Sequence, residues 1–121
     1  MTALTHPMTH TLDVPGATLT YDVRPADAGA TLARVLLLIG SPMGAGGFGT
    51  LARHFTDHTV VTYDPRGVER SVKADPATES TPEQHADDVH RIIADLGSGP
   101  VDLFASSGGA VNALALVERH P

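Results

Sequence analysis

Three short apolar segments, each followed by a segment of helical periodicity, constrain the fold of this chain more than any other feature. The segments are residues 34–39, 59–63 and 101–104; the first contains the continuous apolar run 35–39, and the other two also contain polar residues. A continuous apolar run is typical of a strand covered on both faces, because a half-exposed strand alternates apolar and polar residues. A repeated strand–helix order predicts parallel strands joined by right-handed crossovers.

The helices are marked by apolar periodicity and by end signals. Residues 48–55 carry apolar side chains at i, i+3, i+4 and i+7, which predicts a helix with one buried stripe. Residues 81–84, Thr-Pro-Glu-Gln, predict the start of a second helix with a capping box, and Gly97 predicts its end. A third helix is predicted over 108–120.

Two short alternating runs open the chain. Residues 11–14 and 17–23 flank the turn pair Pro15–Gly16, which predicts an antiparallel hairpin. Residues 27–31 and 68–80 are predicted to be loops. The predicted fold class is therefore α/β, a single domain with a mainly parallel sheet, an N-terminal antiparallel hairpin and flanking helices.

Composition excludes several classes of function. The net charge of −6 argues against a nucleic-acid partner, and the absence of cysteine excludes disulfides and thiol chemistry. The longest apolar run, 35–39, is too short to span a membrane, and residues 1–10 lack a signal-peptide pattern, so a cytoplasmic protein is predicted. His54 and His58 have chelating spacing, but without a third ligand no metal site is predicted, and no cofactor is expected.

The end of the third predicted strand carries the most specific chemical signal. Residues 105–109 read Ala-Ser-Ser-Gly-Gly and lead directly into a helix. A serine at so sharp a turn has its hydroxyl pushed out of the sheet, and the next backbone N–H and the helix N-terminus point to the same space. Ala105 and Gly109 are small enough to let the strand and the helix approach closely. The alternative is an ordinary connection of small residues.

Three segments, in the right order and on the right elements, resemble motifs of the α/β-hydrolase family. Residues 105–109 resemble its G-x-S-x-G nucleophile elbow, with Ala105 in the first glycine position. Residues 39–44, Ile-Gly-Ser-Pro-Met-Gly, are similar to its His-Gly-x-Pro loop, with isoleucine in place of histidine. Residues 60–71 are similar to a strand ending in Asp-x-Arg-Gly-x-Gly-x-Ser, with Glu69 in place of one glycine.

The resemblance implies a serine hydrolase. Ser107 would be the nucleophile, and the backbone N–H groups of Ser41 and Gly108 would form the oxyanion hole. The implied reaction is hydrolysis of an ester, an amide or a related small-molecule carbonyl compound through an acyl-enzyme intermediate. A serine at this position disfavours the branches that use aspartate there, such as haloalkane dehalogenases and most epoxide hydrolases. Asp64 and Arg66 are interpreted as a structural ion pair or loop brace.

The family places its triad in the chain order Ser, acid, His. Of the 14 residues after Ser107, only Glu118 and His120 are an acid and an imidazole. His120 is about 18 Å further along the predicted helix, whereas a general base must come within about 3 Å. The other histidines are expected to be exposed surface residues.

Residues 1–121 are therefore predicted to be the N-terminal part of a single hydrolase domain, ending before the acid and the histidine and inactive alone. The outer edge of the last strand would then be unpaired, a site for aggregation or for a complementing chain. The substrate and the oligomeric state stay open.

Two other functions are compatible with parts of the chain. Residues 44–49 match G-x-G-x-x-G after a strand, and Asp64 ends the next strand, as in a dinucleotide-binding Rossmann domain. In that fingerprint the first glycine stands directly at the end of the strand, but here residues 40–43 separate the strand from Gly44. The dinucleotide-binding interpretation also explains neither the serine turn nor the hairpin. The second alternative is a hydrolase-like fold kept as an inactive binding module, which a serine-directed phosphonate would not label.

Overall fold

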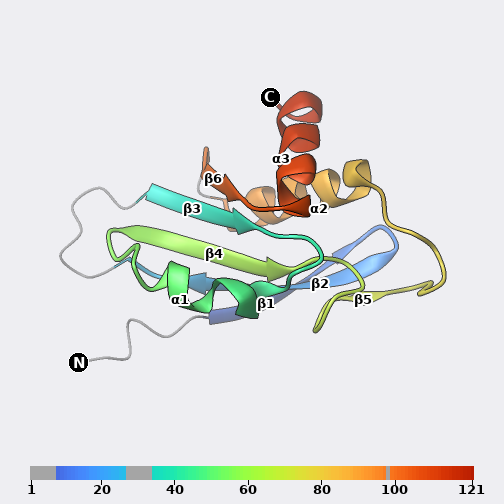
Figure 1. The fold of residues 1–121 in the computed structure, drawn as a ribbon, viewed down its shortest axis with the longest axis horizontal. Coiled ribbons are helices and arrows are strands. Elements are labelled where there is room, and N and C mark those ends of the chain that lie inside the picture. Colours follow the sequence, from blue (N-terminus) through green and yellow to red (C-terminus); the bar gives the residue numbers. More distant parts are fainter. Residues whose placement is uncertain (1–7, 27–33, 98) are drawn as a thin grey trace.

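The computed structural model describes residues 8–26, 34–97 and 99–121. The predicted loop at 27–31 lies outside these residues. The chain order of elements, coloured along the sequence in Figure 1, is β1 (Met8–Val14), β2 (Ala17–Arg24), β3 (Arg34–Ile39), a 3₁₀ turn (Ala45–Phe48), α1 (Gly49–Ala52), β4 (His58–Asp64), β5 (Val72–Lys73), α2 (Pro82–Leu96), β6 (Asp102–Ala105) and α3 (Gly108–Arg119).

The strands form one mixed sheet in the order β1-β2-β4-β3-β6, with β5 paired to β2. The pairs β1–β2 and β2–β4 are antiparallel, whereas β3 is parallel to both β4 and β6. The predicted α/β class, its opening hairpin and its parallel crossovers are confirmed. Within the described residues β6 pairs only with β3, so it forms one edge of the sheet.

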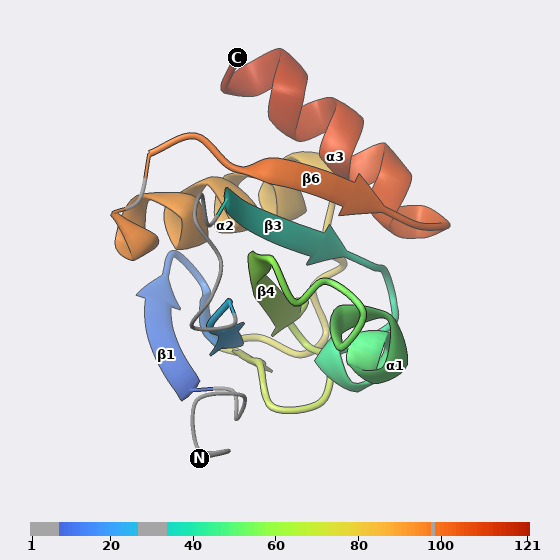
Figure 2. The same cartoon turned by 90° about the vertical axis from the view of Figure 1, so that its left-hand side faces the viewer.

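Alternating side chains of β3 divide the core between the two faces of the sheet. Leu37 and Ile39 are fully buried in the larger cluster, which also takes its side chains from α2 and α3. Leu36 and Leu38 face the smaller cluster with Phe48 beside α1. Figure 2 shows α2 and α3 on one side of the strands and α1 on the other. Burial of each such leucine or isoleucine contributes about 1.5–3 kcal/mol, so β3 contributes to the core on both faces of the sheet.

Helix α2 begins and ends where its capping residues predict. The Thr81 side chain accepts a hydrogen bond from the Gln84 N–H at 3.2 Å, and the Gln84 side chain accepts one from the Thr81 N–H at 3.0 Å. Gly97 has a φ of 67°, the left-handed conformation that glycine adopts at low cost. None of the described helices is long and apolar enough to cross a membrane.

The first predicted helix is much shorter than residues 48–55. The chain forms a 3₁₀ turn and then a single helical turn ending at Ala52, because three glycines within residues 46–49 make a longer helix costly. The apolar stripe still packs, with Phe48 and Ala52 buried. His58 lies in β4 and not on a helix with His54, so the chelating geometry assumed for that pair is wrong.

Candidate active site

The sheet has a topological switch point between β3 and β6. The chain passes from β3 to β4 on one side and then returns over β3 to form β6 on the other side. Connections that diverge in this way leave a crevice at the carboxyl ends of the two strands, where α/β proteins usually bind ligands. The loop that contains Ser41 follows β3, and Ser107 follows β6. The switch point therefore lies between two of the predicted site residues.

Ser107 occupies a strained backbone position between β6 and α3. Its φ of 58° and ψ of −128° lie in the half of conformational space that favours glycine, which costs about 1–3 kcal/mol for another residue. Its side chain is exposed, and its hydroxyl has no hydrogen-bond partner among the described residues. The turn thus holds a free hydroxyl out of the sheet.

Two glycines let this turn contact the loop after β3. A Cβ atom at Gly108 would lie 2.5 Å from the Ser41 carbonyl oxygen, and one at Gly109 would overlap the Ile39 carbonyl oxygen. The Ser106 N–H donates to that Ile39 oxygen at 3.0 Å, which ties the two segments together. The close approach that small residues predict at Gly109 is therefore present.

Ser41 faces the start of α3. Its side chain is half-buried, and its Cβ atom lies 3.5 Å from the position that a Cβ atom at Gly108 would take. Within the part of the chain that the structure describes, the Ser41 hydroxyl has no hydrogen-bond partner. The fold thus brings Ser41, Ser107 and Gly108 together at one edge of the sheet, as the sequence predicts. The sequence analysis does not single out the Ser41 hydroxyl, because the family motif assigns a role only to the backbone N–H at this position.

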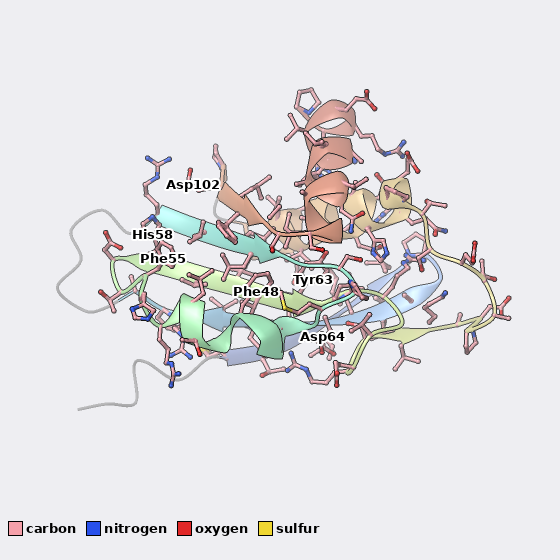
Figure 3. All side chains as sticks on the ribbon, viewed as in Figure 1. Phe48, Phe55, His58, Tyr63, Asp64 and Asp102 are labelled. Carbon is pink, nitrogen blue, oxygen red and sulfur yellow. The ribbon has the colours of Figure 1, made fainter. Side chains whose placement is uncertain are left out.

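The Asp64 carboxylate braces the glycine-rich loop beside this site. It is buried at the carboxyl end of β4 (Figure 3), where it accepts hydrogen bonds from the Ala45 N–H at 2.8 Å, from the Arg70 N–H at 3.0 Å and from Arg70 Nε at 2.7 Å. Burial alone would raise the pKa of Asp64, but these hydrogen bonds with Arg70 and Ala45 hold it below its usual value. Asp64 is therefore ionised and structural.

Arg66 braces a different part of the fold. Its guanidinium makes two 2.8 Å hydrogen bonds to the fully buried Asp88 of α2 and one 2.8 Å bond to the Pro15 carbonyl oxygen. Asp64 and Arg66 are thus loop braces, as interpreted from the sequence. They do not pair with each other, because each has a closer partner from another element.

The same contacts argue against dinucleotide binding. In the fingerprint, the acid that ends the second strand must be free to bind a ribose hydroxyl. Asp64 is 1% exposed and already accepts three hydrogen bonds. Residues 44–49 also form only a 3₁₀ turn and the start of a four-residue helix.

A hollow of about 740 Å³ lies beside the glycine-rich loop. Met43, Gly44, Glu69 and Arg70 contribute to its wall, and Ser107 does not. Among the described residues, Glu69 and Ser107 are the two non-glycine residues with positive φ, and the φ of Glu69 is 47°. The family motif has glycine at the position of Glu69, so the replacement of that glycine by glutamate carries a backbone cost.

Several of the described histidines have side-chain contacts away from Ser107. The ring of His120 is 2.9 Å from Asp87 and stacks on His90 with ring centres 3.8 Å apart. His58 lies at the amino end of β4, at the opposite end of the strand from Asp64 (Figure 3). His85 corrects the expectation of exposed histidines, because it is 9% exposed and its Nδ1 has no partner. His6 lies outside the described residues.

No three or more His, Asp or Glu side chains among the described residues are grouped so that they could hold a metal ion. Neither Glu118 nor any described histidine forms a hydrogen bond with Ser107. The structure therefore places the predicted nucleophile and its neighbouring loop together, but adds no general base to them.

Comparison with known proteins agrees with this geometry. The family model for the alpha/beta hydrolase fold matches residues 33–121. The chain is 41% identical over 112 residues to the uncharacterised hydrolase YraK of Bacillus subtilis strain 168, covering 92% of this chain and 40% of YraK.

Two solved structures share the fold at lower identity. The first is the N-acyl homoserine lactonase AidH complexed with N-hexanoyl homoserine, with 19% identity, a TM-score of 0.80 and coverage of 96% of this chain and 42% of AidH. The second is an epoxide hydrolase of Vigna radiata, with 21% identity, a TM-score of 0.78 and coverage of 95% of this chain and 35% of the Vigna radiata protein. The chain spans about two fifths of the length of these proteins. It belongs to the alpha/beta hydrolase fold family.

Proposed function

We propose that this chain supplies the nucleophile and the oxyanion donors of a serine hydrolase. The observation that carries the proposal is the Ser107 hydroxyl, which is exposed and unpartnered on a residue with φ of 58°. Backbone strain of this kind persists where the surrounding structure holds a residue in a functional position. The close approach of Ser41 to Gly108 supports the proposal, because the two residues proposed to supply the oxyanion N–H groups are then neighbours in space.

The proposed reaction is acyl transfer from an ester, an amide or a related carbonyl compound. The Ser107 oxygen forms a bond to the carbonyl carbon while its proton passes to a general base, and the carbonyl oxygen becomes an oxyanion. The N–H groups of Ser41 and Gly108 bind that oxyanion, and each such donor is worth about 3 kcal/mol in the transition state. The bond to the leaving group then breaks as that group takes the proton, and water later releases the acid from Ser107.

The general base is proposed to come from outside residues 1–121, with the triad acid. None of the described histidines forms a hydrogen bond with Ser107, and His120 follows the last residue of α3, at the far end of that helix. YraK, which this chain matches over 40% of its length, has ample further sequence for an acid and a histidine. The chain alone is accordingly proposed to be inactive.

Chemical rescue tests the nucleophile without the missing base. We expect the 121-residue chain to react with an alkyl fluorophosphonate only when imidazole is added as a free base. The Ser107 oxygen forms a bond to phosphorus, fluoride leaves and imidazole takes the proton. Mass spectrometry of the intact chain and of its peptides measures the rate and the position of the label.

The Ser107→Ala variant and urea-unfolded chain are the controls, and both should stay unlabelled under the same conditions. Imidazole-dependent labelling of the folded chain at Ser107 supports the proposal. An unlabelled Ser107, or equal labelling in urea, contradicts it and favours the inactive binding module.

A further inference from the structure

We propose that the side-chain hydroxyl of Ser41 is a third donor to the oxyanion, in addition to the two backbone N–H groups. This inference rests on the proposed function of Ser107. It assigns a catalytic contact to a side chain, whereas the family motif identifies this position only by its backbone.

The position of Ser41 is set by contacts on both sides. Its carbonyl oxygen faces Gly108, and its Cβ atom lies 3.5 Å from where a Cβ atom at Gly108 would stand. A carbon–carbon bond adds about 1.5 Å, so the Ser41 Cβ lies within about 5 Å of the Gly108 Cα. The Ser41 Cβ, which carries the hydroxyl, therefore lies beside the first residue of α3, whose backbone N–H is a proposed oxyanion donor.

The loop that carries Ser41 is fixed at both ends. On one side the Ile39 carbonyl oxygen accepts the Ser106 N–H at 3.0 Å. On the other side the Ala45 N–H donates to the buried Asp64 carboxylate at 2.8 Å. A side chain on such a braced loop needs little reorganisation to meet a charge, which is the condition under which a donor stabilises a transition state.

The Ser41 hydroxyl is also free to donate. It is half-buried, and no hydrogen bond to any other described residue occupies it. Its proton is therefore available to a group that binds beside the turn. A hydroxyl bonded to an oxyanion is charge-assisted and about twice as strong as a neutral pair, so it favours the transition state over the neutral carbonyl.

The test compares maximal rates of phosphonate labelling at saturating imidazole, because the phosphoryl oxygen takes the place of the carbonyl oxygen. Ser41→Ala keeps the backbone N–H and removes only the hydroxyl. We expect its maximal labelling rate to fall at least about tenfold, since loss of one oxyanion donor costs about 10²–10³ in other hydrolases. The probe concentration that gives half the maximal rate should stay unchanged.

Two further variants separate a donor from a structural role. Ser41→Thr restores a hydroxyl and should recover most of the rate. Ser80→Ala removes a half-buried hydroxyl far from the site and should label like the unmodified chain. Thermal melting of each variant measures whether the fold is retained.

The possible results are distinct. A Ser41→Ala variant that melts normally and labels at the full rate, while Ser107→Ala stays unlabelled, overturns this inference and leaves the proposed function intact. Slow labelling of both Ser41→Ala and Ser41→Thr also overturns it, because a hydroxyl then fails to rescue. An unmodified chain that is not labelled at Ser107 removes both proposals together.

Discussion

Replacing Gly108 with alanine is expected to push apart the two segments that form the candidate site. The added Cβ would lie 2.5 Å from the Ser41 carbonyl oxygen and 3.3 Å from the Ser41 carbonyl carbon. Ordinary contact begins at 3.4 Å, so the oxygen and the new methyl group must separate by about 0.9 Å. Both neighbours are backbone, and neither can turn away as a long side chain would.

This displacement has two measurable consequences. Overpacking of this kind costs about 1–3 kcal/mol, so the free energy of unfolding should fall by that amount. A shift approaching 1 Å in a positioning group costs about 10²-fold in rate, so imidazole-rescued labelling of Ser107 should fall by a similar factor. A hundredfold loss of rate corresponds to about 2.7 kcal/mol of activation free energy, which is comparable with the expected loss of stability.

Gly49→Ala is the matched control for the Gly108→Ala experiment. Gly49 has a helical φ of −56°, and a Cβ atom there would have no neighbour within 4 Å. Alanine should therefore stabilise α1 by about 0.4–1 kcal/mol and leave the labelling rate unchanged. Urea unfolding followed by circular dichroism gives the free energies. A Gly108→Ala variant as stable and as reactive as the unmodified chain would refute the steric argument.

Three further changes test other features of the fold. Glu69→Gly should stabilise the chain by about 0.5–1 kcal/mol, measured by urea unfolding, because glycine adopts the positive φ of 47° without strain. Asp88→Ala should destabilise it by about 3–5 kcal/mol, because the buried Arg66 guanidinium loses its carboxylate; a loss below 1 kcal/mol would contradict this. Burial lowers the pKa of His85 below 6.5; the nearby Asp88 opposes that shift, and the nearby Arg66 and Lys73 add to it. The unfolded chain then binds a proton that the folded chain does not, so stability should decrease as the pH falls below 6.5 towards the lowered pKa. Thermal melts between pH 7.5 and 5.5 should show this decrease, His85→Gln should reduce it, and the exposed His54→Gln should not.

Where local chemistry determines the structure, the sequence predicts it well. The capping box of Thr81 and Gln84 and the stop at Gly97 fix α2 within a residue. The strand predicted at 34–39 has the bounds of β3, because no polar residue interrupts its apolar run at 35–39. The sequence Ser-Ser-Gly-Gly after a strand predicts a tight strand-to-helix turn, but the strained backbone of Ser107 distinguishes that turn from an ordinary connection of small residues only in the structure.

Where tertiary contacts decide, the sequence is less informative. Val72–Lys73 forms a two-residue strand only because β2 offers an edge to it, and so short a segment has no periodicity of its own. Asp88 appears in the sequence as one more polar residue of an amphipathic helix, and only the fold brings Arg66 to it from another element. The burial of His85 has the same origin. The positions of Ser41 and Ser107 agree with their predicted roles, and those roles await the labelling experiments.

Ser107 lies in the turn directly after β6, the outermost parallel strand among the described residues, and this location has a consequence for its mobility. Strand β6 has four residues and is hydrogen-bonded on one side only within the described residues, so its amide protons should exchange faster than those of β3. Phe104 and, on α3, Val111, Leu114 and Val117 leave apolar surface exposed beside it. A further strand that paired with this free side of β6 would add hydrogen bonds to it and so would be expected to order the turn that carries Ser107, the proposed nucleophile.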